Sequence, residues 1–408
     1  MMGEILFLAH RIPWPPDRGD KIRSWQLLRK LTTLAPVHLA CFADDEADLA
    51  HRETLAPLLA SIHVEKRTRS RLAAAAAGLA TGKPLSVSLF DSAEIRRFVS
   101  DRLALGDIDC IFAFSGQMAQ FVPVDTGSAR FVMDFVDVDS AKFTSYAESA
   151  APPMRWIHAR EGRRLAAFEA AVAERADASL FVSEAEAALF RTRTGLGPER
   201  VRAVENGVDL AFFDPAGRYS LPEKRGPLIV FTGQMDYRPN IDAVVRFSHQ
   251  SFRTVRAALP DASFAIVGRK PDPAVRALAG LPGVIVTGEV PDVRGWLATA
   301  DVVVAPLGIA RGVQNKVLEA MAMARPVIAS PAAFEGIDAR PGRDLLVAHG
   351  SDAEAMTVLD LLADPARGNA LGRAARARIE ERYAWDARLA GLPAIVGCPG
   401  ASVAEAAE

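Results

Sequence analysis

The sequence predicts an α/β protein made of two doubly wound parallel sheets that face each other across a cleft. Short apolar, β-branched runs alternate with helical patterns along most of the chain, as parallel sheets with crossover helices require. A length of 408 residues exceeds one ordinary domain and suits two of roughly 200 residues each. Residues 216–227 are rich in glycine, proline and charge, and they separate two such alternating regions as a linker would.

The first region opens with the apolar run from Ile5 to His10, the expected first strand, and a helix is expected over residues 20–34. The loop between them is longer than a usual βα loop and holds three prolines. A long stiff loop at the carboxyl end of a strand is where α/β proteins bind ligands, and the cations of this loop, Lys21 among them, could meet a diphosphate or an anionic acceptor. Other strands are expected at residues 37–42, 62–64, 108–114 and 178–182, and in the second region at 228–233, 262–267, 284–290, 301–306, 326–329 and 345–347.

Composition narrows the functional classes. A formal net charge of −2 gives no general case for binding nucleic acid. Cys41, Cys110 and Cys398 are odd in number and lack metal-ligand or redox spacing, which favours a reducing cytoplasm. The N-terminus is unlike a signal peptide, and no apolar run reaches the ~20 residues needed to span a bilayer. We therefore expect a cytoplasmic protein that is soluble or at most peripheral to a membrane.

The stretch from residue 301 to residue 323 carries the clearest chemical signal. Residues 301–306 form a β-branched run with a proline stop, and a helix should begin near Gly312. The unpaired amides and positive dipole end of that helix suit a phosphate, and Lys316 adds a positive charge about one turn in. The carboxylate of Glu319 lies deeper in the helix, at a depth that suits the hydroxyl pair of a ribose.

These residues, with Arg325 to Ser330 and Phe334 to Ile337, resemble the donor-nucleotide site of retaining glycosyltransferases of the family-4 type, which have two Rossmann-like domains (GT-B). That family has two glutamates eight residues apart, the first near the donor sugar and the second at the ribose. Glu319 matches the second, whereas Arg311 occupies the first position. The form Gly-x-Gln-Asn-Lys-x-x-Glu also resembles a branch associated with exosortase and exopolysaccharide gene clusters. The donor contacts implied in this turn are Arg311, Gly312, Val313, Gln314 and Asn315; the alternative is an ordinary βα turn.

The resemblance implies donor contacts elsewhere in the chain. Gly233, at the end of the strand 228–233, opens a turn that in the family holds the diphosphate, and we expect Arg238 with Lys316 to form the clamp, supplemented by Arg311. Val293 belongs to a segment similar to the short helix that grips the nucleobase through its backbone. Gly19 corresponds to the first-domain loop that approaches the donor, although a solvated surface loop is the alternative.

Domain limits follow from the linker and from the same resemblance. Residues 1–215 are expected to form the N-terminal acceptor-side domain, and residues 228–383 the nucleotide-sugar domain. Residues 384–398 resemble the crossover segment that returns to the first domain. Residues 399–408 are expected to be a disordered tail.

Three carboxylates close together mark the acceptor side of the predicted site. Strand alternation places Asp134 near the end of a strand, with Asp137 and Asp139 in the loop beyond and Lys142 close by. Carboxylates this close raise at least one pKa unless a cation or a sugar compensates. This pattern also resembles the exosortase-associated branch.

Two interpretations of this cluster are open, and a third can hold alongside either. Asp137 or Asp139 could accept hydrogen bonds from sugar hydroxyls or assist deprotonation of the attacking hydroxyl. Alternatively, the oxygens could bind Mg²⁺ or Mn²⁺. We favour the first, with no metal, because enzymes of the resembled type manage the leaving diphosphate with cations and amides. The structural alternative is an N-cap made by Asp139 or Ser140. Ser115, after the strand 108–114, is placed where an acceptor could lie.

A basic segment raises the question of membrane contact. Four cations fall within residues 66–71, beside a run of alanines. Such a segment suits the interface of an anionic bilayer, at ~1 kcal/mol per cation, and it equally suits a solvated helix start.

The function that the resemblance implies is transfer of a sugar from a nucleotide-sugar to a hydroxyl of a saccharide or lipid-linked acceptor. Retention of configuration and a role in exopolysaccharide or cell-surface glycan synthesis are expected, at the inner face of the cytoplasmic membrane. Arg238, Lys316 and the amides around Gly312 would stabilise the departing diphosphate. The alternatives are a nucleotide-sugar epimerase of the same fold and a non-catalytic sugar-nucleotide-binding scaffold.

Overall fold

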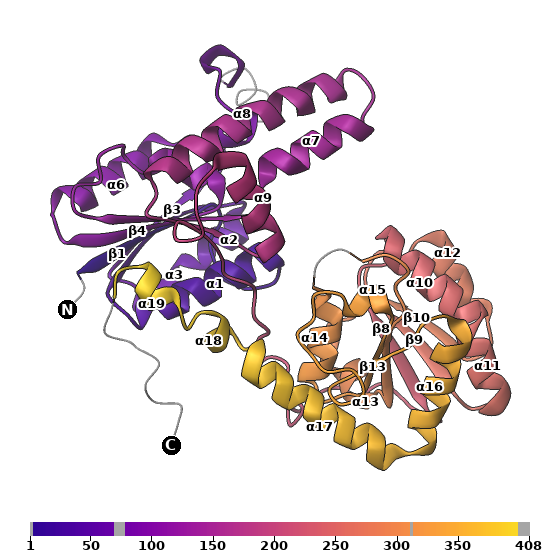
Figure 1. Cartoon of the computed structure of the whole chain (residues 1–408). Helices are drawn as coiled ribbons and strands as arrows, with labels where there is room; N and C mark the ends of the chain where they lie inside the picture. The colour runs from indigo at the N-terminus through magenta and orange to yellow at the C-terminus, as the bar shows by residue number, and fades with distance from the viewer. Residues whose placement is uncertain (1–2, 69–77, 311–312, 399–408) are drawn as a thin grey trace. The chain divides into compact units, whose positions relative to one another are not determined.

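The computed structural model describes residues 3–68, 78–310 and 313–398, and the chain divides into two compact units (Figure 1). The first comprises Met1–Asn206 with Arg388–Glu408, and the second Gly207–Ala387. Each unit is built on one parallel sheet, which confirms the predicted α/β class with two sheets. The division falls at Asn206 rather than after residue 215, so the stretch 216–227 lies within the second unit.

The first sheet has seven parallel strands in the order β3-β2-β1-β4-β5-β6-β7. Because parallel crossovers are right-handed, the helices that follow β1 and β2 cover one face of this sheet and those that follow β3 to β6 cover the other. The strands are β1 (Glu4–Ala9), β2 (Val37–Ala43), β3 (Ser61–Lys66), β4 (Ile108–Phe114), β5 (Arg130–Val136), β6 (Ala178–Phe181) and β7 (Val201–Ala203). The helices are α1 (Gly19–Thr32), α2 (Glu46–Ala50), α3 (Arg52–Leu55), η1 (Ala56–Leu58), α5 (Leu85–Ser88), α6 (Ala93–Ala104), η2 (Gly116–Phe121), α7 (Asp139–Ser149), α8 (Met154–Arg175), α9 (Glu184–Thr194) and α19 (Leu392–Ile395).

The second sheet has six parallel strands in the order β10-β9-β8-β11-β12-β13. The strands are β8 (Leu228–Thr232), β9 (Ser263–Val267), β10 (Val284–Gly288), β11 (Val302–Ala305), β12 (Val327–Ala329) and β13 (Leu346–Val347). The helices are α10 (Arg238–His249), α11 (Ser251–Ala258), α12 (Pro273–Ala277), η3 (Leu278–Gly280), α13 (Arg294–Thr299), α14 (Asn315–Ala322), α15 (Pro331–Phe334), α16 (Ser351–Ala363) and α17 (Pro365–Arg382). The division between the units falls inside α18 (Trp385–Arg388).

Burial explains why the strands are continuous apolar runs. All seven residues of β2 and all five of β8 are buried, because helices cover both faces of each sheet. Each unit has its own hydrophobic core between its sheet and its helices. No helix in the described ranges is both long and apolar enough to cross a membrane.

Unusual backbone collects at the carboxyl edges of both sheets. Ser115 after β4 has φ 74°, and Val136 at the end of β5 has φ 72°, although left-handed backbone is strongly disfavoured for a β-branched residue. Gly233 after β8 has φ 155°. Strained backbone of this kind concentrates at functional sites, so the side chains near these two edges are candidates for a functional site.

Candidate active site

Two glycines bring the ends of β8 and β9 into direct backbone contact. The amide of Gly233 donates to the carbonyl of Val267 at 3.0 Å. A Cβ on Gly268 would lie 1.6 Å from the carbonyl oxygen of Gly233, and a Cβ on Gly233 would lie 2.9 Å from Nδ2 of Asn240. Side chains are therefore excluded here, and bare backbone faces the carboxyl edge of the sheet, where α/β folds bind ligands.

Lys316 lies beside this turn and is held by two groups. Its Nζ donates to Oδ1 of Asn240 at 2.5 Å and lies 4.7 Å from the centre of the Phe231 ring. Nδ2 of Asn240 donates to the carbonyl of Gln234 at 2.8 Å, which orients the amide oxygen towards the lysine. Burial lowers the pKa of Lys316 to about 8, although the charge of Glu319 opposes the shift. A poorly solvated ammonium of this kind is prepared to bind an anion.

Glu319 lies one turn further along α14. Burial raises the pKa of its carboxyl to about 7, while Lys316 lowers it. Within the described ranges, its carboxylate makes no hydrogen bond and no ion pair. A desolvated carboxylate without a hydrogen-bond partner among the described residues suits neutral hydroxyl donors such as those of a ribose.

The helix carrying these two residues begins later than predicted. Gln314 has an extended backbone, φ −87° and ψ 99°, so it is the N-cap, and α14 starts at Asn315 rather than near Gly312. The first turn closes on the carbonyl of Gln314, which accepts from the amide of Val317 at 2.9 Å. Asn315 is exposed, while Val313 is half-buried and packs on the core. The predicted donor contacts Arg311 and Gly312 lie outside the described residues.

Arg238 is not brought to Lys316 in this structure. It is the first residue of α10, its guanidinium pairs with Asp242 at 2.9 Å, and 81% of its side chain is exposed. Among the described residues, Lys316 donates instead to Asn240. An asparagine two residues after the arginine, in the first turn of α10, is the signal that could have indicated it.

Val293 takes part in its own helix. It is the N-cap of α13, and its carbonyl accepts from the amides of Trp296 and Leu297, each at 3.1 Å. The neighbouring Arg294 pairs with Asp292 at 2.8 Å, and its guanidinium lies 3.8 Å from the centre of the Phe212 ring. The carbonyl of Val293 is therefore occupied, and its predicted contact with a nucleobase stays a prediction.

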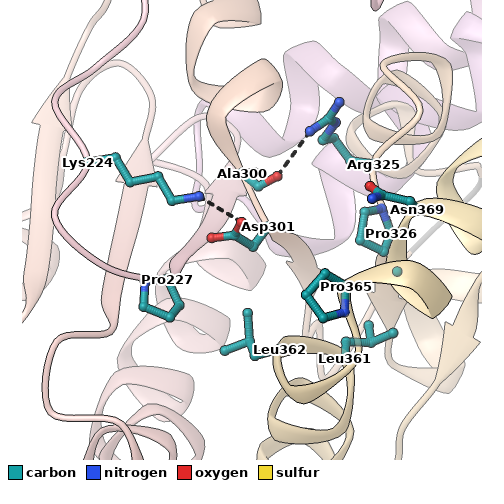
Figure 2. Close-up of a pocket in the computed structure, with 11 residues that line it drawn as sticks. Lys224, Pro227, Ala300, Asp301, Arg325, Pro326, Leu361, Leu362, Pro365 and Asn369 are labelled. Carbon is teal, nitrogen blue, oxygen red and sulfur yellow. Dashed lines mark hydrogen bonds and ion pairs between the residues drawn. The ribbon is translucent and has the colours of Figure 1, made fainter.

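In two cavities of the second unit, the lysine and arginine side chains already have partners in the protein. One, of about 350 Å³, lies beyond the carboxyl ends of β11 and β12, and its Arg246 is paired with Glu354 at 2.6 Å. The other, of about 320 Å³, lies at the amino ends of β8, β11 and β12 (Figure 2). There Lys224 pairs with Asp301 at 2.7 Å, and Arg325 donates to the carbonyl of Ala300 at 3.3 Å. These partners neutralise or occupy the cations, so neither cavity resembles a built anion site.

Asp134 lies in the interior of the first unit. Its burial is incompatible with the acceptor role predicted for it. It is fully buried and receives Nε of Arg23 at 2.9 Å and the amide of Val136 at 3.0 Å. Arg23 also donates to the carbonyl of Val204 at 2.7 Å and to Asn206 at 2.9 Å. This ion pair joins α1 to β5 and to the chain after β7, and its physical role is to anchor those segments.

Asp137 and Asp139 remain at the surface beside Lys142. Nζ of Lys142 lies 3.2 Å from Asp139 and 3.9 Å from Asp137, whose side chain is 45% exposed. Burial raises the pKa of Asp137, Lys142 opposes the shift, and Glu186 adds to it. The cluster therefore offers one carboxyl whose pKa lies above its ordinary value at an accessible strand end.

The N-cap expected from Asp139 or Ser140 is wrong. The cap of α7 is Val138, whose amide donates to Glu186 at 2.6 Å. The amide and hydroxyl of Ser140 donate instead to Glu169, at 3.0 and 2.5 Å. No group of three or more His, Cys, Asp or Glu residues in the described ranges has the arrangement of a metal site.

The loop after β1 is a network of ion pairs. Arg11 pairs with Asp20 at 2.6 Å and with Asp44 at 2.8 Å, and Arg18 also reaches both carboxylates. Lys21 is buried and pairs with Asp48 at 2.7 Å, which does not support its predicted contact with an anionic group. Gly19 begins α1 in open space, because a Cβ at this position would meet nothing within 4 Å.

His10 is a polar residue of this edge that sequence reasoning missed. Its Nε2 lies 3.2 Å from Asp20, its ring stacks on Phe114 at 5.7 Å, and its buried Nδ1 has no hydrogen-bond partner among the described residues. Burial lowers the pKa of His10, and the hydrogen bond to Asp20 opposes this. Next to Phe114 lies Ser115, whose amide donates to the carbonyl of Asp134 at 2.8 Å and whose hydroxyl donates to Gln117.

Comparison with known proteins gives this geometry a family context. Residues 226–364, which include Gly233, Lys316 and Glu319, match the family described as glycosyl transferases group 1. A Corynebacterium glutamicum protein named GDP-mannose-dependent monoacylated alpha-(1-6)-phosphatidylinositol monomannoside mannosyltransferase is 29% identical over 231 residues. That match spans 52% of this chain and 59% of the relative's length.

Solved structures resemble nearly the whole chain. Sucrose-phosphate synthase from Thermosynechococcus elongatus has a TM-score of 0.63 at 20% identity, covering 96% of this chain and 98% of that one. The Anabaena protein HepE in complex with UDP-glucose has a TM-score of 0.58 at 14% identity, covering 95% and 97%. At these identities the likeness establishes the fold. The chain therefore matches the group 1 glycosyl transferase family over residues 226–364, and it has the two-sheet GT-B fold of these solved structures.

Proposed function

We propose that this protein transfers a glycosyl unit from a nucleotide-sugar to a hydroxyl of a saccharide or lipid-linked acceptor. The observation that carries the proposal is the arrangement at the end of β8, where Lys316 lies beside the bare backbone of Gly233 and Glu319 follows one turn later on the same helix. Both side chains lie in the segment that matches the transferase family. Their pKa values are shifted towards neutrality by burial, as is common at sites that bind charged substrates.

In the proposed mechanism, Lys316 stabilises the diphosphate as it departs from the sugar. An ammonium that is already desolvated and fixed by Asn240 needs little reorganisation when negative charge develops beside it. Glu319 accepts hydrogen bonds from the ribose, which places the nucleotide relative to that charge. Arg238 joins the clamp only if its exposed side chain leaves Asp242, and Arg311, Gly312, Gln314 and Asn315 complete the donor contacts.

On the acceptor side, Asp137 accepts a hydrogen bond from the attacking hydroxyl or assists its deprotonation. We propose retention of anomeric configuration, no metal requirement, and a role in exopolysaccharide or cell-surface glycan synthesis at the inner face of the cytoplasmic membrane. The name of the mannosyltransferase relative, which specifies a phosphatidylinositol mannoside, supports the lipid-linked class of acceptor.

The first test is a nucleotide-release assay with UDP-, GDP- and ADP-sugars, with and without EDTA. We expect release from one donor, insensitivity to the chelator, and loss of release in Lys316→Ala and Glu319→Ala. The matched controls are Lys224→Ala, at the opposite edge of the same sheet, and Glu223→Ala, whose side chain is 82% exposed. Both controls should retain activity.

Other outcomes would favour the two rival functions. Donor binding without release in any acceptor mixture would indicate a sugar-nucleotide-binding scaffold. Interconversion of the donor sugar without release of nucleotide would indicate an epimerase. Absence of binding to every donor by folded protein would refute the donor site.

A further inference from the structure

The hairpin of α7 and α8 carries an unusual exposed apolar surface. The two helices pack against each other and extend away from the first sheet (Figure 1). Trp156 is 69% exposed, Met154 46% and Ile157 42%, all at the start of α8, and Tyr146 of α7 is 47% exposed. Single exposed apolar residues are ordinary, but three within four residues, including a tryptophan, form a patch that calls for a partner.

Cations continue this patch along one face of α8. Trp156, Arg160 and Arg163 follow a spacing of four and then three residues, so they lie on one helical stripe, with Ile157 and Arg164 beside it. Arg163 and Arg164 are exposed. The face therefore combines an apolar, aromatic end with a row of arginines.

The nearby segment before α5 adds to this face. The guanidinium of Arg160 donates to the carbonyl of Gly78 at 2.9 Å and to that of Lys83 at 3.3 Å. This contact brings exposed Leu79 and the exposed side chain of Lys83 next to α8.

Acidic side chains do little to neutralise the face. Glu161 is buried; it accepts the amides of Leu85 and Ser86 at 2.8 and 2.9 Å and lies 3.8 Å from Arg160, so the free cations of the face are the exposed ones. Glu148, near the end of α7, is exposed, against the exposed cations Lys83, Arg155, Arg163 and Arg164. The surface is thus positively charged where it is also apolar.

We propose that this face of α8, with the tip of the hairpin, is a docking surface for an anionic lipid bilayer. Tryptophan is favoured at the boundary between acyl chains and headgroups, where its ring is apolar and its N–H stays hydrated. Arginines on the same stripe extend to lipid phosphates while their stems cover apolar surface. The exposed cations of the face are complementary in charge to an anionic bilayer.

This surface differs from the one predicted from the sequence. Of the basic segment 66–71, Lys66 pairs with Glu46 at 2.6 Å and Arg67 with Asp44 at 2.9 Å, so both cations already have protein partners. Residues 69–71 lie outside the described residues. The inference rests on the membrane location given in the proposed function and names the surface that would make the contact, although docking on a bilayer requires neither donor nor acceptor.

Co-flotation of the full chain with lipid vesicles tests the proposal. Vesicles of pure phosphatidylcholine are compared with equimolar phosphatidylcholine and phosphatidylglycerol. We expect binding only to the anionic vesicles, weakened about 30-fold in the double variant Arg163→Gln with Arg164→Gln, which removes two cations at ~1 kcal/mol each. Trp156→Ala should weaken binding about tenfold, because it removes buried apolar area.

Matched controls come from the opposite face of the first sheet, where α3 and η1 carry exposed Arg52 and Leu58. Arg52→Gln and Leu58→Ala should bind vesicles like the wild type. Equal loss in these controls, absence of wild-type binding, or binding unaffected by the α8 variants would overturn the proposal. Self-association that is lost in Trp156→Ala, without vesicle binding, would also overturn it and assign the face to a second copy of the chain. Nucleotide release by the α8 variants with soluble substrates should be unchanged, so failure of docking and failure of the transferase proposal remain distinguishable.

Discussion

The buried ammonium of Lys316 should cost the second unit stability. Its pKa lies near 8 rather than at 10.5 because burial disfavours its charge. Replacing Lys316 with methionine keeps a similar stem and removes the charge. We therefore expect Lys316→Met to abolish donor binding and to make the protein more resistant to unfolding. Such an exchange of stability for function is expected at residues of a ligand-binding site.

The size of the expected gain in the free energy of unfolding follows from the pKa of Lys316. A lowering from 10.5 to about 8 corresponds to roughly 3 kcal/mol of differential free energy at neutral pH. The variant loses the hydrogen bond to Asn240, at about 1 kcal/mol, and Glu319 loses its nearby cation. The net gain in the free energy of unfolding should be about 1 to 2 kcal/mol.

The stability gained in Lys316→Met should fall as pH rises. Below about pH 8 the lysine is charged in both folded and unfolded protein, so the full cost is present. Between about pH 8 and 10.5 the folded protein loses the proton first, and the cost disappears as pH rises. The advantage of Lys316→Met over the wild type should therefore be largest at pH 7 and should shrink by about 2 kcal/mol at pH 10.

Urea unfolding at both pH values measures this difference, with Lys224→Met as the control. Lys224 is paired with Asp301 at the opposite edge of the sheet, so its replacement should give no gain at pH 7. A Lys316→Met variant that is less stable than the wild type at pH 7, or whose advantage is the same at pH 10, would refute the account of Lys316 as a desolvated cation.

Three further predictions concern residues at the carboxyl edges of the two sheets. Binding of UDP or GDP, measured by titration calorimetry, should weaken as pH rises above about 8 in the wild type, because Lys316 loses its charge; a flat profile would contradict the diphosphate contact. Arg23→Met should destabilise the first unit by about 3 to 5 kcal/mol in urea unfolding, because it leaves the charge of Asp134 buried without its cation, and a loss below about 1 kcal/mol would argue against this anchoring role. Gly268→Ala should abolish donor binding and lower stability, because its Cβ would overlap a backbone oxygen 1.6 Å away, whereas Gly280→Ala, which meets nothing within 4 Å, should behave like the wild type in both assays.

Much of the fold could be predicted from the sequence because its cause is local. Continuous apolar runs such as Ile5 to Ala9 can be satisfied only by strands covered on both faces, and their alternation with helices leads to parallel sheets. Lys316 and Glu319 could also be found in this way, because both lie on one helix and their three-residue spacing brings them onto one face. The start of that helix was misplaced because the turn before it stays extended through Gln314.

Only the tertiary structure decided which charged groups are free to act. Asp134 and Asp137 are three residues apart and look alike in sequence, yet Asp134 is anchored by Arg23, which is 111 residues away, and Asp137 stays accessible. Asn240 reaches Lys316 across 76 residues because the turns after β8 and β11 meet at one edge of the sheet. The energy of a charge depends on its burial and on its partners, and those partners come from distant parts of the chain, so no local pattern encodes them.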